Sequence, residues 1–517
     1  MRSSRIPVLV ATAAALLSTS ALAAHHLTPL PSRHGWDTSK PVFKAPPGSI
    51  SGTWTGLTHA FPGSGFPDTT VQLTDGTVLM HDGCTTDWYK LTPDNTGSYV
   101  NGTWTKAASM PSGYSPLYFA SQMMPDGHVM VSGGEYLNCS AVWTNKGAIY
   151  DTAANTWTNV APPTGWTKIG DAQSVVRDDG HYMVANCCTS QEAIATISGT
   201  SVTWTSTGTG KGDSNDEEGW TQLPDGTIFT VDANRSLGAN NQVEIYSEAS
   251  GTWTTSATKT PVECTDPTSH EIGPAPLLPN GLVYQICATP HTAVYNPLTG
   301  NWTVGPDIPA VDGALDSADG PAAVLPDGNV LMQVSPGVFN APSHFFEAKV
   351  KNATHVTLTQ VNEPASAASQ DSYEGRLMLL PTGQVIWASD VGDVQIYTPQ
   401  GKPVKNAIPT ISGVATTIHR GSTNNEVDGV GFNGLTYGGY YGDDVQESTN
   451  YPLVRITNNA SGNVCYAKTH SYATGISTGA TTSAQFDVPN SCTKGKSKLV
   501  VVVNGIASKP TTVKVAN

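Results

Sequence analysis

Short apolar stretches alternate with tight turns along most of the chain, and one turn phrase returns seven times. Stretches such as MPDGHVMV, LPDGTIFT and LPDGNVLM place Asp-Gly or a close variant directly before an apolar run. The seven turns end at Gly76, Gly127, Gly180, Gly226, Gly281, Gly328 and Gly383, at intervals of 51, 53, 46, 55, 47 and 55 residues. Asp-Gly between apolar runs predicts a β-hairpin because both central turn residues need positive φ. Each repeat therefore begins with two strands joined at this turn.

A tryptophan phrase interleaves with the turns. The tryptophans that follow a small or turn residue are Trp54, Trp104, Trp157, Trp204, Trp253 and Trp302. Tyrosine-bearing runs such as AIYD, EIYS and AVYN precede several of them. One repeat therefore holds four short antiparallel strands, the content of one propeller blade, and seven repeats predict seven blades. An open solenoid is the alternative, and it would need atypical capping repeats at both ends.

The tryptophan count favours a closed ring. The seventh turn unit runs to VQIYTP and has no tryptophan strand of its own, whereas Trp54 precedes every turn unit. We expect the Trp54 strand to complete the last blade, because this closure removes a free sheet edge.

The chain changes character after the last repeat. Residues 409–517 alternate apolar and polar positions in YPLVRIT, AQFDVP and KLVVVVNG, with turns between these runs. This pattern predicts an immunoglobulin-like β-sandwich of about seven strands. The predicted fold class is therefore all-β, with a seven-bladed β-propeller over residues 24–408 and a β-sandwich over residues 409–517. A charged content of only 13%, with 51 glycines and 36 prolines, agrees with many short strands and turns.

The first 23 residues have the pattern of a signal peptide. Arg2 and Arg5 precede an apolar stretch, and Ala21-Leu22-Ala23 is a small-residue cleavage site. We therefore expect a secreted or periplasmic protein, and no other segment is long enough to span a membrane. A net charge of −15 argues against nucleic acid and anionic membranes as partners. We expect a monomer.

Eight cysteines in an oxidising compartment favour disulfides. Cys465 and Cys492 are the only cysteines of the C-terminal region, so we pair them, and Cys264 with Cys287 fits within one blade. The partners of Cys84, Cys139, Cys187 and Cys188 stay open. No Cys/His spacing resembles a zinc site.

Seven kelch-like units, a closing N-terminal strand and an immunoglobulin-like domain resemble the galactose oxidase and glyoxal oxidase group of copper radical enzymes. The resemblance is strongest in SYEGRLMLLPTGQV, CYAKTHSYATG and KLVVVVNGIASKP. It implies a kelch-type propeller with copper on its axis. Two tyrosines and a histidine from inner strands, with a histidine from a sandwich loop, would hold the metal. A cysteine would be crosslinked to one of the tyrosines.

Carried over by position, the family's copper site is incomplete. The tyrosine-histidine pair falls on Tyr373 and Glu374, and the sandwich histidine falls on His470. The crosslinking cysteine falls on Tyr118, and its tyrosine partner falls on Asp171. An intact copper-radical cofactor therefore cannot form, and we expect no galactose oxidase activity. Tyr373, Glu374 and His470 are the candidate metal ligands; type II copper can still bind through them, although they are a poor set for the radical mechanism.

Carboxylates occupy the positions where the family has its ligands. The position nine residues before the turn glycine, or its neighbour, is where each first strand starts and where the blades converge. Around the ring these residues are Asp68, Tyr118, Asp171, Glu217, Glu271, Asp319 and Glu374. Six of the seven are acidic in a chain with only 41 Asp and Glu among 517 residues. We interpret them as the lining of an acidic axial pocket; the alternative is polar loop residues on an acidic protein.

Such a pocket suits extracellular carbohydrate. The favoured hypothesis is glycoside hydrolysis by paired carboxylates, one protonating the leaving oxygen and the other acting as nucleophile or base. The candidate catalytic residues are Asp171, Glu217, Asp319, Glu374, His470 and Tyr373, and the candidate substrate-binding residues are Tyr118, Glu271, Arg376 and Trp220.

Three alternatives stay open. The carboxylates can hold Ca²⁺. The protein can bind glycans without cleaving them, with Trp88 and Trp220 stacking on sugar faces. It can also be a divergent copper-dependent oxidase. We expect the acidic pair Asp443-Asp444 to lie in a solvated turn rather than in a site.

Overall fold

The computed structural model describes residues 42–46, 51–234, 241–437, 439–440 and 446–517, and the predicted signal peptide lies outside them. The described chain is all-β, with two short 3₁₀ helices, η1 (Ala365–Ser369) and η2 (Lys405–Ala407). Neither helix of the described residues is long and apolar enough to cross a membrane.

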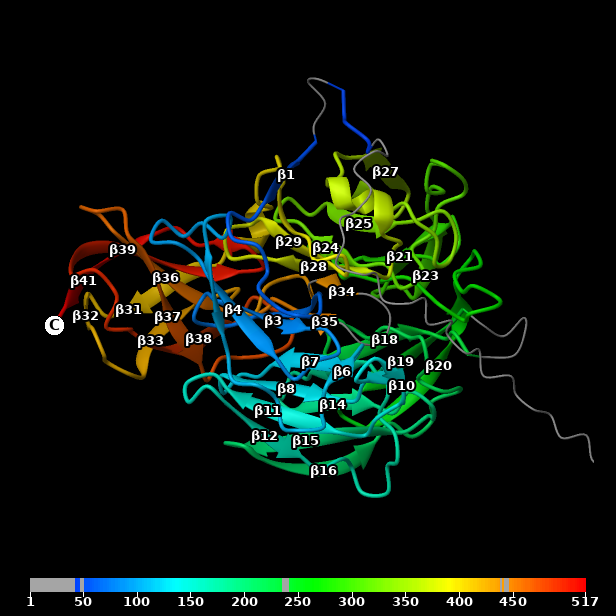
Figure 1. The fold of residues 1–517 in the computed structure, drawn as a ribbon, viewed down its shortest axis with the longest axis horizontal. Coiled ribbons are helices and arrows are strands. Elements are labelled where there is room, and N and C mark those ends of the chain that lie inside the picture. Colours follow the sequence, from blue (N-terminus) through cyan, green and yellow to red (C-terminus); the bar gives the residue numbers. More distant parts are fainter. Residues whose placement is uncertain (1–41, 47–50, 235–240, 438, 441–445) are drawn as a thin grey trace, which may run out of the picture.

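Small antiparallel sheets follow one another along the chain from residue 53 to residue 398 (Figure 1). The first contains β2 (Pro67–Gln72), β3 (Val78–Asp82), β4 (Trp88–Thr92) and β5 (Thr103–Lys106). The second contains β7 (Ala120–Met123), β8 (His128–Ser132), β11 (Gly147–Asp151) and β12 (Thr156–Val160). The third contains β13 (Ser174–Val176), β14 (Tyr182–Ala185), β15 (Glu192–Ser198) and β16 (Ser201–Thr207).

Four further sheets complete this series. The fourth sheet contains β17 (Thr221–Gln222), β18 (Thr227–Val231), β19 (Gln242–Ser247) and β20 (Thr252–Lys259), and the fifth contains β21 (Val283–Ile286), β22 (Thr292–Asn296) and β23 (Asn301–Val304). The sixth contains β24 (Ala322–Val324), β25 (Val330–Val334), β26 (His344–Asn352) and β27 (His355–Gln360). The seventh contains β28 (Gly375–Leu379), β29 (Val385–Ser389) and β30 (Val394–Thr398) together with β1 (Thr53–Gly56). A separate small sheet contains β6 (Pro116–Leu117), β9 (Tyr136–Leu137) and β10 (Ser140–Ala141). This series of small antiparallel sheets is consistent with a β-propeller.

The seven predicted turns form, with two differences from the prediction. Among the described turn residues only the glycine of each phrase has a positive φ, and the fifth sheet has an isolated bridge between Leu277 and Val283 in place of its first strand. Each of the seven turn glycines has a positive φ, between 80° and 92°. The Gly76 amide donates to the carbonyl of Leu73 at 3.0 Å, and the same hydrogen bond recurs at the other turns. Only glycine adopts this backbone conformation without steric cost, and the phrase therefore marks every hairpin.

The predicted role of the Trp54 strand is also confirmed. β1 pairs with β30, and Trp54 stands directly opposite Tyr397. The two rings lie 4.8 Å apart, and the same Tyr-Trp pairing recurs at Tyr150 with Trp157. The indole of Trp54 donates to the carbonyl of Asn362 at 2.6 Å, which fixes the strand to the preceding segment. The N-terminal strand therefore completes the sheet that contains the last turn unit.

The C-terminal residues form a larger sheet. Its strands are β31 (Thr410–Val414), β32 (Thr417–His419), β33 (Asn425–Val430), β36 (Leu453–Asn458), β37 (Val464–His470), β38 (Thr481–Asp487), β39 (Gly495–Val503), β40 (Ile506–Ala507) and β41 (Thr511–Ala516). The sheet has nine strands rather than about seven. β37 pairs with β36 through its first half and with β38 through its second half.

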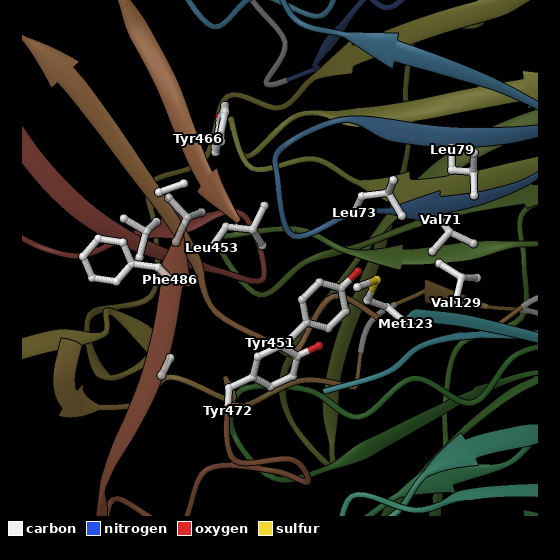
Figure 2. Close-up of a cluster of buried hydrophobic side chains, with 14 of the residues drawn as sticks. Val71, Leu73, Leu79, Met123, Val129, Tyr451, Leu453, Tyr466, Tyr472 and Phe486 are labelled. Atoms are coloured by element: carbon white, nitrogen blue, oxygen red, sulfur yellow. The ribbon is translucent and has the colours of Figure 1, made fainter. Parts of the chain in front are cut away.

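This sheet docks on the turn ends of the first strands. Tyr451 and Tyr472 point from it into a cluster of apolar side chains that also contains Val71, Leu73 and Met123 (Figure 2). The phenol of Tyr451 donates to the carbonyl of Gln72 at 2.5 Å. The starts of the first strands are consequently left at the opposite end.

One hairpin departs from the C-terminal sheet. β34 (Gly439–Tyr440) and β35 (Gln446–Glu447) pair with each other and lie against β2, β7, β24 and β28, the first strands of four different sheets. The hydroxyl of Ser448 donates to the side-chain oxygen of Gln122 at 3.1 Å, just after this hairpin. The C-terminal region therefore reaches between the first strands.

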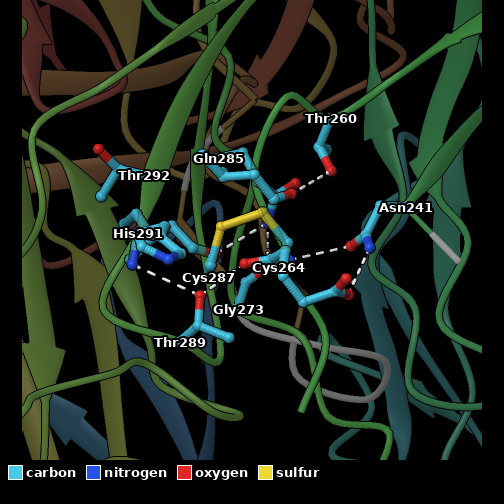
Figure 3. Close-up of a disulfide and its surroundings, with 12 residues drawn as sticks. Asn241, Thr260, Cys264, Gly273, Gln285, Cys287, Thr289, His291 and Thr292 are labelled. Atoms are coloured by element: carbon cyan, nitrogen blue, oxygen red, sulfur yellow. Dashed lines mark hydrogen bonds between the residues drawn. A yellow bond between two sulfur atoms is a disulfide. The ribbon is translucent and has the colours of Figure 1, made fainter. Parts of the chain in front are cut away.

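Four disulfides link the described residues. The Cys264–Cys287 and Cys465–Cys492 bonds form as predicted. Figure 3 shows the first of these, where the amide of Cys264 also donates to the side-chain oxygen of Asn241 at 3.0 Å. The other two join Cys84 to Cys139 and Cys187 to its neighbour Cys188. Such bonds are typical of a secreted protein.

Candidate functional site

The residues at the starts of the first strands adopt unusual backbone conformations. Tyr118, Glu217 and Asp319 have φ values of 51°, 58° and 45°. A left-handed conformation costs a non-glycine residue about 1–2 kcal/mol, and it persists only where the surroundings impose it. Three different sheets therefore hold a side chain at the same strained position.

Three carboxylates form one close group, the carboxylate triad of Glu217, Glu271 and Asp319. One oxygen from each lies within 4.8 Å of the others. Glu271 is fully buried. Burial, and then the negative charges of Asp319 and Glu217, raise the pKa of Glu271 well above its usual value. The three carboxyl groups therefore lie close enough for the charges of Asp319 and Glu217 to disfavour ionisation of Glu271.

A second acidic group surrounds Arg376. The guanidinium is buried, and its Nη2 lies 3.0 Å from Oδ1 of Asp68. Burial raises the pKa of Asp68, but the charge of Arg376 and a hydrogen bond from His81 outweigh it, so this pKa lies below its usual value. Asp68 is therefore the ionised partner of Arg376.

Asp371, Glu374 and Asp390 form the rest of this group, the Asp390 cluster. Burial, more than any other cause, raises the pKa of each carboxyl above its usual value. Repulsion from Glu374 adds to the rise for Asp371 and Asp390, and Arg376 opposes it for Asp390. The charge of Asp319 also acts on Asp371, so the cluster and the carboxylate triad are neighbours.

Aromatic side chains adjoin the Asp390 cluster. The ring of Tyr373 lies 5.2 Å from Phe339 and 6.2 Å from Tyr118. The guanidinium of Arg376 lies 5.2 Å from the centre of the Tyr118 ring. Burial and the charge of Asp390 raise the pKa of Tyr118, which therefore stays a neutral phenol. Phe339 is 39% exposed, so this aromatic row reaches the surface.

Asp171, and Glu217 of the carboxylate triad, both lie near Tyr136. Their charges act on the buried ring of Tyr136, whose pKa is raised first by burial and then by these carboxylates and Glu135. The acidic residues at the starts of the first strands therefore form a series of neighbouring charges. The series runs from Asp171 through the carboxylate triad to the Asp390 cluster.

The prediction of Trp220 as a substrate-binding residue is wrong, as is the suggestion that Trp88 stacks on sugar. Both side chains are fully buried. Trp220 packs 5.8 Å from Trp253, and Trp88 packs 5.3 Å from Trp157. Large apolar rings next to a strand are buried between neighbouring sheets, because this removes the most surface from water.

The placement of His470 in the site is also wrong. Its Nε2 lies 3.3 Å from Oδ1 of Asp487 within the C-terminal sheet. The next residue, Ser471, donates its amide to the carbonyl of Pro125 in a turn at the far end of a first strand. The candidate ligand set of Tyr373, Glu374 and His470 therefore does not assemble. The segment that reaches between the first strands is the β34–β35 hairpin, and Asp443 and Asp444 lie outside the described residues.

Sequence reasoning also missed Asp371 and Asp390. Asp390 directly follows β29, the second strand of its sheet. Because β29 runs antiparallel to β28, its end lies beside the start of β28. A signal for it exists, because Asp82, Asp232 and Asp390 stand six or seven residues after their turn glycines. Phe339 had no signal, because it belongs to a loop that the repeat does not specify.

The copper site of the resembled family does not fit these residues. Within the described chain, no group of His, Cys, Asp and Glu spaced for a metal ion includes Glu374 or His470. The ring of Tyr373 lies next to the rings of Phe339 and Tyr118. A second metal-like group, Asp171 with Cys187 and Asp216, contains a cysteine that is already in a disulfide.

A third acidic group is filled by the protein's own lysine. Lys211 Nζ lies 2.5 Å from Asp213, 2.8 Å from Glu244, 3.0 Å from Glu218 and 3.8 Å from Asp232. The lysine side chain is completely buried. This cluster therefore stabilises the fold rather than forming an open site.

Comparison with known proteins gives partial matches. No protein-family model matches the chain. A kelch-like protein, terF, from Aspergillus terreus is 35% identical over 86 residues, which is 16% of this chain and 18% of that protein. The chain thus spans less than a fifth of this curated relative, whose kelch-like description agrees with the repeat.

Solved structures are similar at low identity. A fungal alcohol oxidase of the AA5 family, in complex with copper, is 12% identical, with 90% of this chain and 100% of that chain covered and a TM-score of 0.49. Virginiamycin B lyase from Staphylococcus aureus is 11% identical, with 67% and 98% covered and a TM-score of 0.47. Neither similarity assigns an activity to this chain.

Proposed function

We propose that this protein is a secreted, seven-bladed kelch-type β-propeller with an immunoglobulin-like C-terminal domain, and that it acts on extracellular carbohydrate. The seven turn units, each with its own small sheet, support the blade count. The pairing of β1 with β30 supports closure of the ring. The carbohydrate would bind at the starts of the first strands, because the acidic groups and the aromatic row gather there.

The reaction we propose is glycoside hydrolysis by two carboxyl groups. Glu374 is the general acid, because its pKa is raised, mainly by burial, and its side chain is still partly exposed. Asp319 is the second carboxylate, which acts as nucleophile or base; it is partly exposed and starts the neighbouring sheet. The observation that carries this proposal is that Glu374, a partly exposed carboxyl whose pKa is raised, stands with other carboxyl groups at one place beside an aromatic row. Tyr373 and Phe339 would stack on the sugar ring beside Glu374.

The test is release of reducing ends from a panel of plant and microbial polysaccharides. We expect Glu374→Gln and Asp319→Asn to lower turnover by about 10²–10⁴-fold, as loss of a general acid or base does. Asp171→Asn and Glu217→Gln should mainly raise KM. Glu426→Gln, at an exposed glutamate of the C-terminal sheet, is the matched control. If no polysaccharide yields reducing ends, or if all these variants keep full turnover, hydrolysis is refuted.

Two other outcomes have observations in their favour. The aromatic row supports glycan binding without cleavage, which affinity electrophoresis on the same panel would reveal. The spacing of the carboxylate triad, with oxygens within 4.8 Å, supports a Ca²⁺ site instead. In that case EDTA should lower the melting temperature, Ca²⁺ should restore it, and Asp319→Asn should abolish this response.

A further inference from the structure

The Asp390 cluster contains buried carboxylate oxygens that accept no hydrogen bond. Oδ1 of Asp390 and Oδ1 of Asp371 have no such partner, and the two residues are only 5% and 7% exposed. A buried, unsatisfied acceptor is costly, so natural structures retain one chiefly where something else satisfies it. Arg376 has its Nη2 3.0 Å from Oδ1 of Asp68, and its Nη1 donates to the carbonyls of Tyr373 and Gly375.

Hydrogen bonds from backbone amides link the three residues of this cluster. The amide of Asp371 donates to Oε2 of Glu374 at 3.2 Å. The amide of Asp390 donates to the carbonyl of Glu374 at 3.2 Å. Asp371 and Glu374 come just before β28, and Asp390 comes just after β29. The three residues thus lie together where the two strands of the β28–β29 hairpin begin and end.

The ligand that suits this cluster is an ammonium group rather than a metal ion. Within the described residues, the groups spaced for a metal ion do not include Asp371, Glu374 or Asp390. An ammonium donates three hydrogen bonds and tolerates acceptors that are spread apart. A neutral hydroxyl would leave the repulsion between the carboxylates unrelieved.

The surroundings indicate that this ammonium belongs to a sugar. Tyr373 lies between Asp371 and Glu374 in the sequence, and its ring is 5.2 Å from the exposed Phe339. Aromatic faces beside polar groups suit the C–H face of a pyranose ring. A net charge of −15 also attracts a cationic polymer over long range.

Building on the proposed function, we propose that Asp371 and Asp390, beside Glu374, form a subsite for the protonated amine of a hexosamine. The substrate class is then an oligomer or polymer of non-acetylated amino sugar. Asp390 and Asp371 are binding residues that select this substrate, whereas the proposed chemistry of Glu374 also operates on neutral sugars.

Calorimetric titration of the full mature chain with three hexasaccharides tests this proposal. The three sugars carry an amine (glucosamine), an acetamide (N-acetylglucosamine) or a hydroxyl (glucose) at the same carbon. We expect the glucosamine hexamer to bind at least about tenfold more tightly than either of the others, which is about 1.4 kcal/mol. This preference should weaken as salt rises. The comparison uses the unmodified protein and needs no variant to fold.

Asp390→Asn should remove the preference for the amine, whereas Glu426→Gln, at an exposed glutamate of the C-terminal sheet, should keep it. Equal affinity of the wild-type protein for all three sugars would overturn the amine subsite and leave carbohydrate action intact. Binding of spermine as tight as that of the glucosamine hexamer would overturn the sugar assignment. If no saccharide of the wider panel binds or is cleaved, the proposed function itself fails, and the subsite fails with it.

Discussion

Lys211 offers the sharpest test of how this fold tolerates its buried charge. Its Nζ is within 4 Å of four carboxylates, and Glu218, Asp232 and Glu244 have side chains with no exposed surface. Lys211→Met keeps most of the apolar stem and removes the positive charge. The four carboxyls would then face one another in a site that water does not reach.

Removing one partner of a buried ion pair costs about 3–5 kcal/mol, because the other partner is left uncompensated. We expect the loss for Lys211→Met to lie within this range, because protonation of the carboxyl groups limits it. Burial already raises the pKa of Glu218 well above its usual value, and Lys211 is what opposes that rise. Without Lys211 more of these carboxyl groups must bind a proton in the folded state. Protonating one of them costs about 1.4 kcal/mol for each pH unit by which the solution lies above the ordinary pKa of the group.

The loss should therefore depend on pH with a definite sign. Above a pH of about 4.5 the carboxyl groups of the unfolded chain have lost their protons, whereas those of the folded variant, with raised pKa values, still bind them. The stability of the folded variant therefore falls as pH rises. The difference from wild type should be large at pH 7.5 and should shrink towards pH 5. Chemical denaturation at both values measures it, with the exposed Lys402→Met as control. Equal stability of wild type and Lys211→Met at pH 7.5 would refute this reasoning.

Three further predictions follow from the same contacts. Trp54→Ala should lower the free energy of unfolding by about 2–3 kcal/mol, because β1 would lose its contacts with Phe345 and Tyr397. This is less than the ~3–5 kcal/mol typical of a fully buried ring, since Trp54 is partly exposed. An unchanged denaturation midpoint would contradict the role of β1 in closing the last sheet. Burial raises the pKa of Glu192 to about 8 and those of Glu248 and Asp316 to about 7, so stability should fall as pH rises from about 5 to 8. Glu192→Gln should flatten this decline, and a melting temperature that rises with pH would oppose it. Copper-loaded protein should form no hydrogen peroxide from galactose or glyoxal-type aldehydes, because Tyr118 and Asp171 stand at the crosslink positions; peroxide at enzymatic rates would overturn this expectation.

The parts of the fold that depend on neighbours in the sequence could be predicted from the sequence. The Asp-Gly turns are local, since a glycine with positive φ fixes each hairpin wherever it occurs. The tyrosine and tryptophan runs could be recognised as neighbouring strands because they follow each other directly in the sequence. The last unit has no tryptophan run of its own, which identified the Trp54 segment as its missing strand. Counting cysteines within short segments gave the Cys264–Cys287 and Cys465–Cys492 bonds.

The tertiary structure alone decided which residues share the acidic site. Both His470 and the β34–β35 hairpin belong to the C-terminal region, but only docking of that region on the turn ends determines which of them reaches between the first strands. Packing of neighbouring sheets buried Trp220, and the return of β29 brought Asp390 beside Glu374. These contacts join residues far apart in the chain, and their free energy comes from burial and charge that no local pattern records. The sequence by itself therefore determined the strands, the turns and the acidic positions, whereas the packing between sheets determined which of those positions act together.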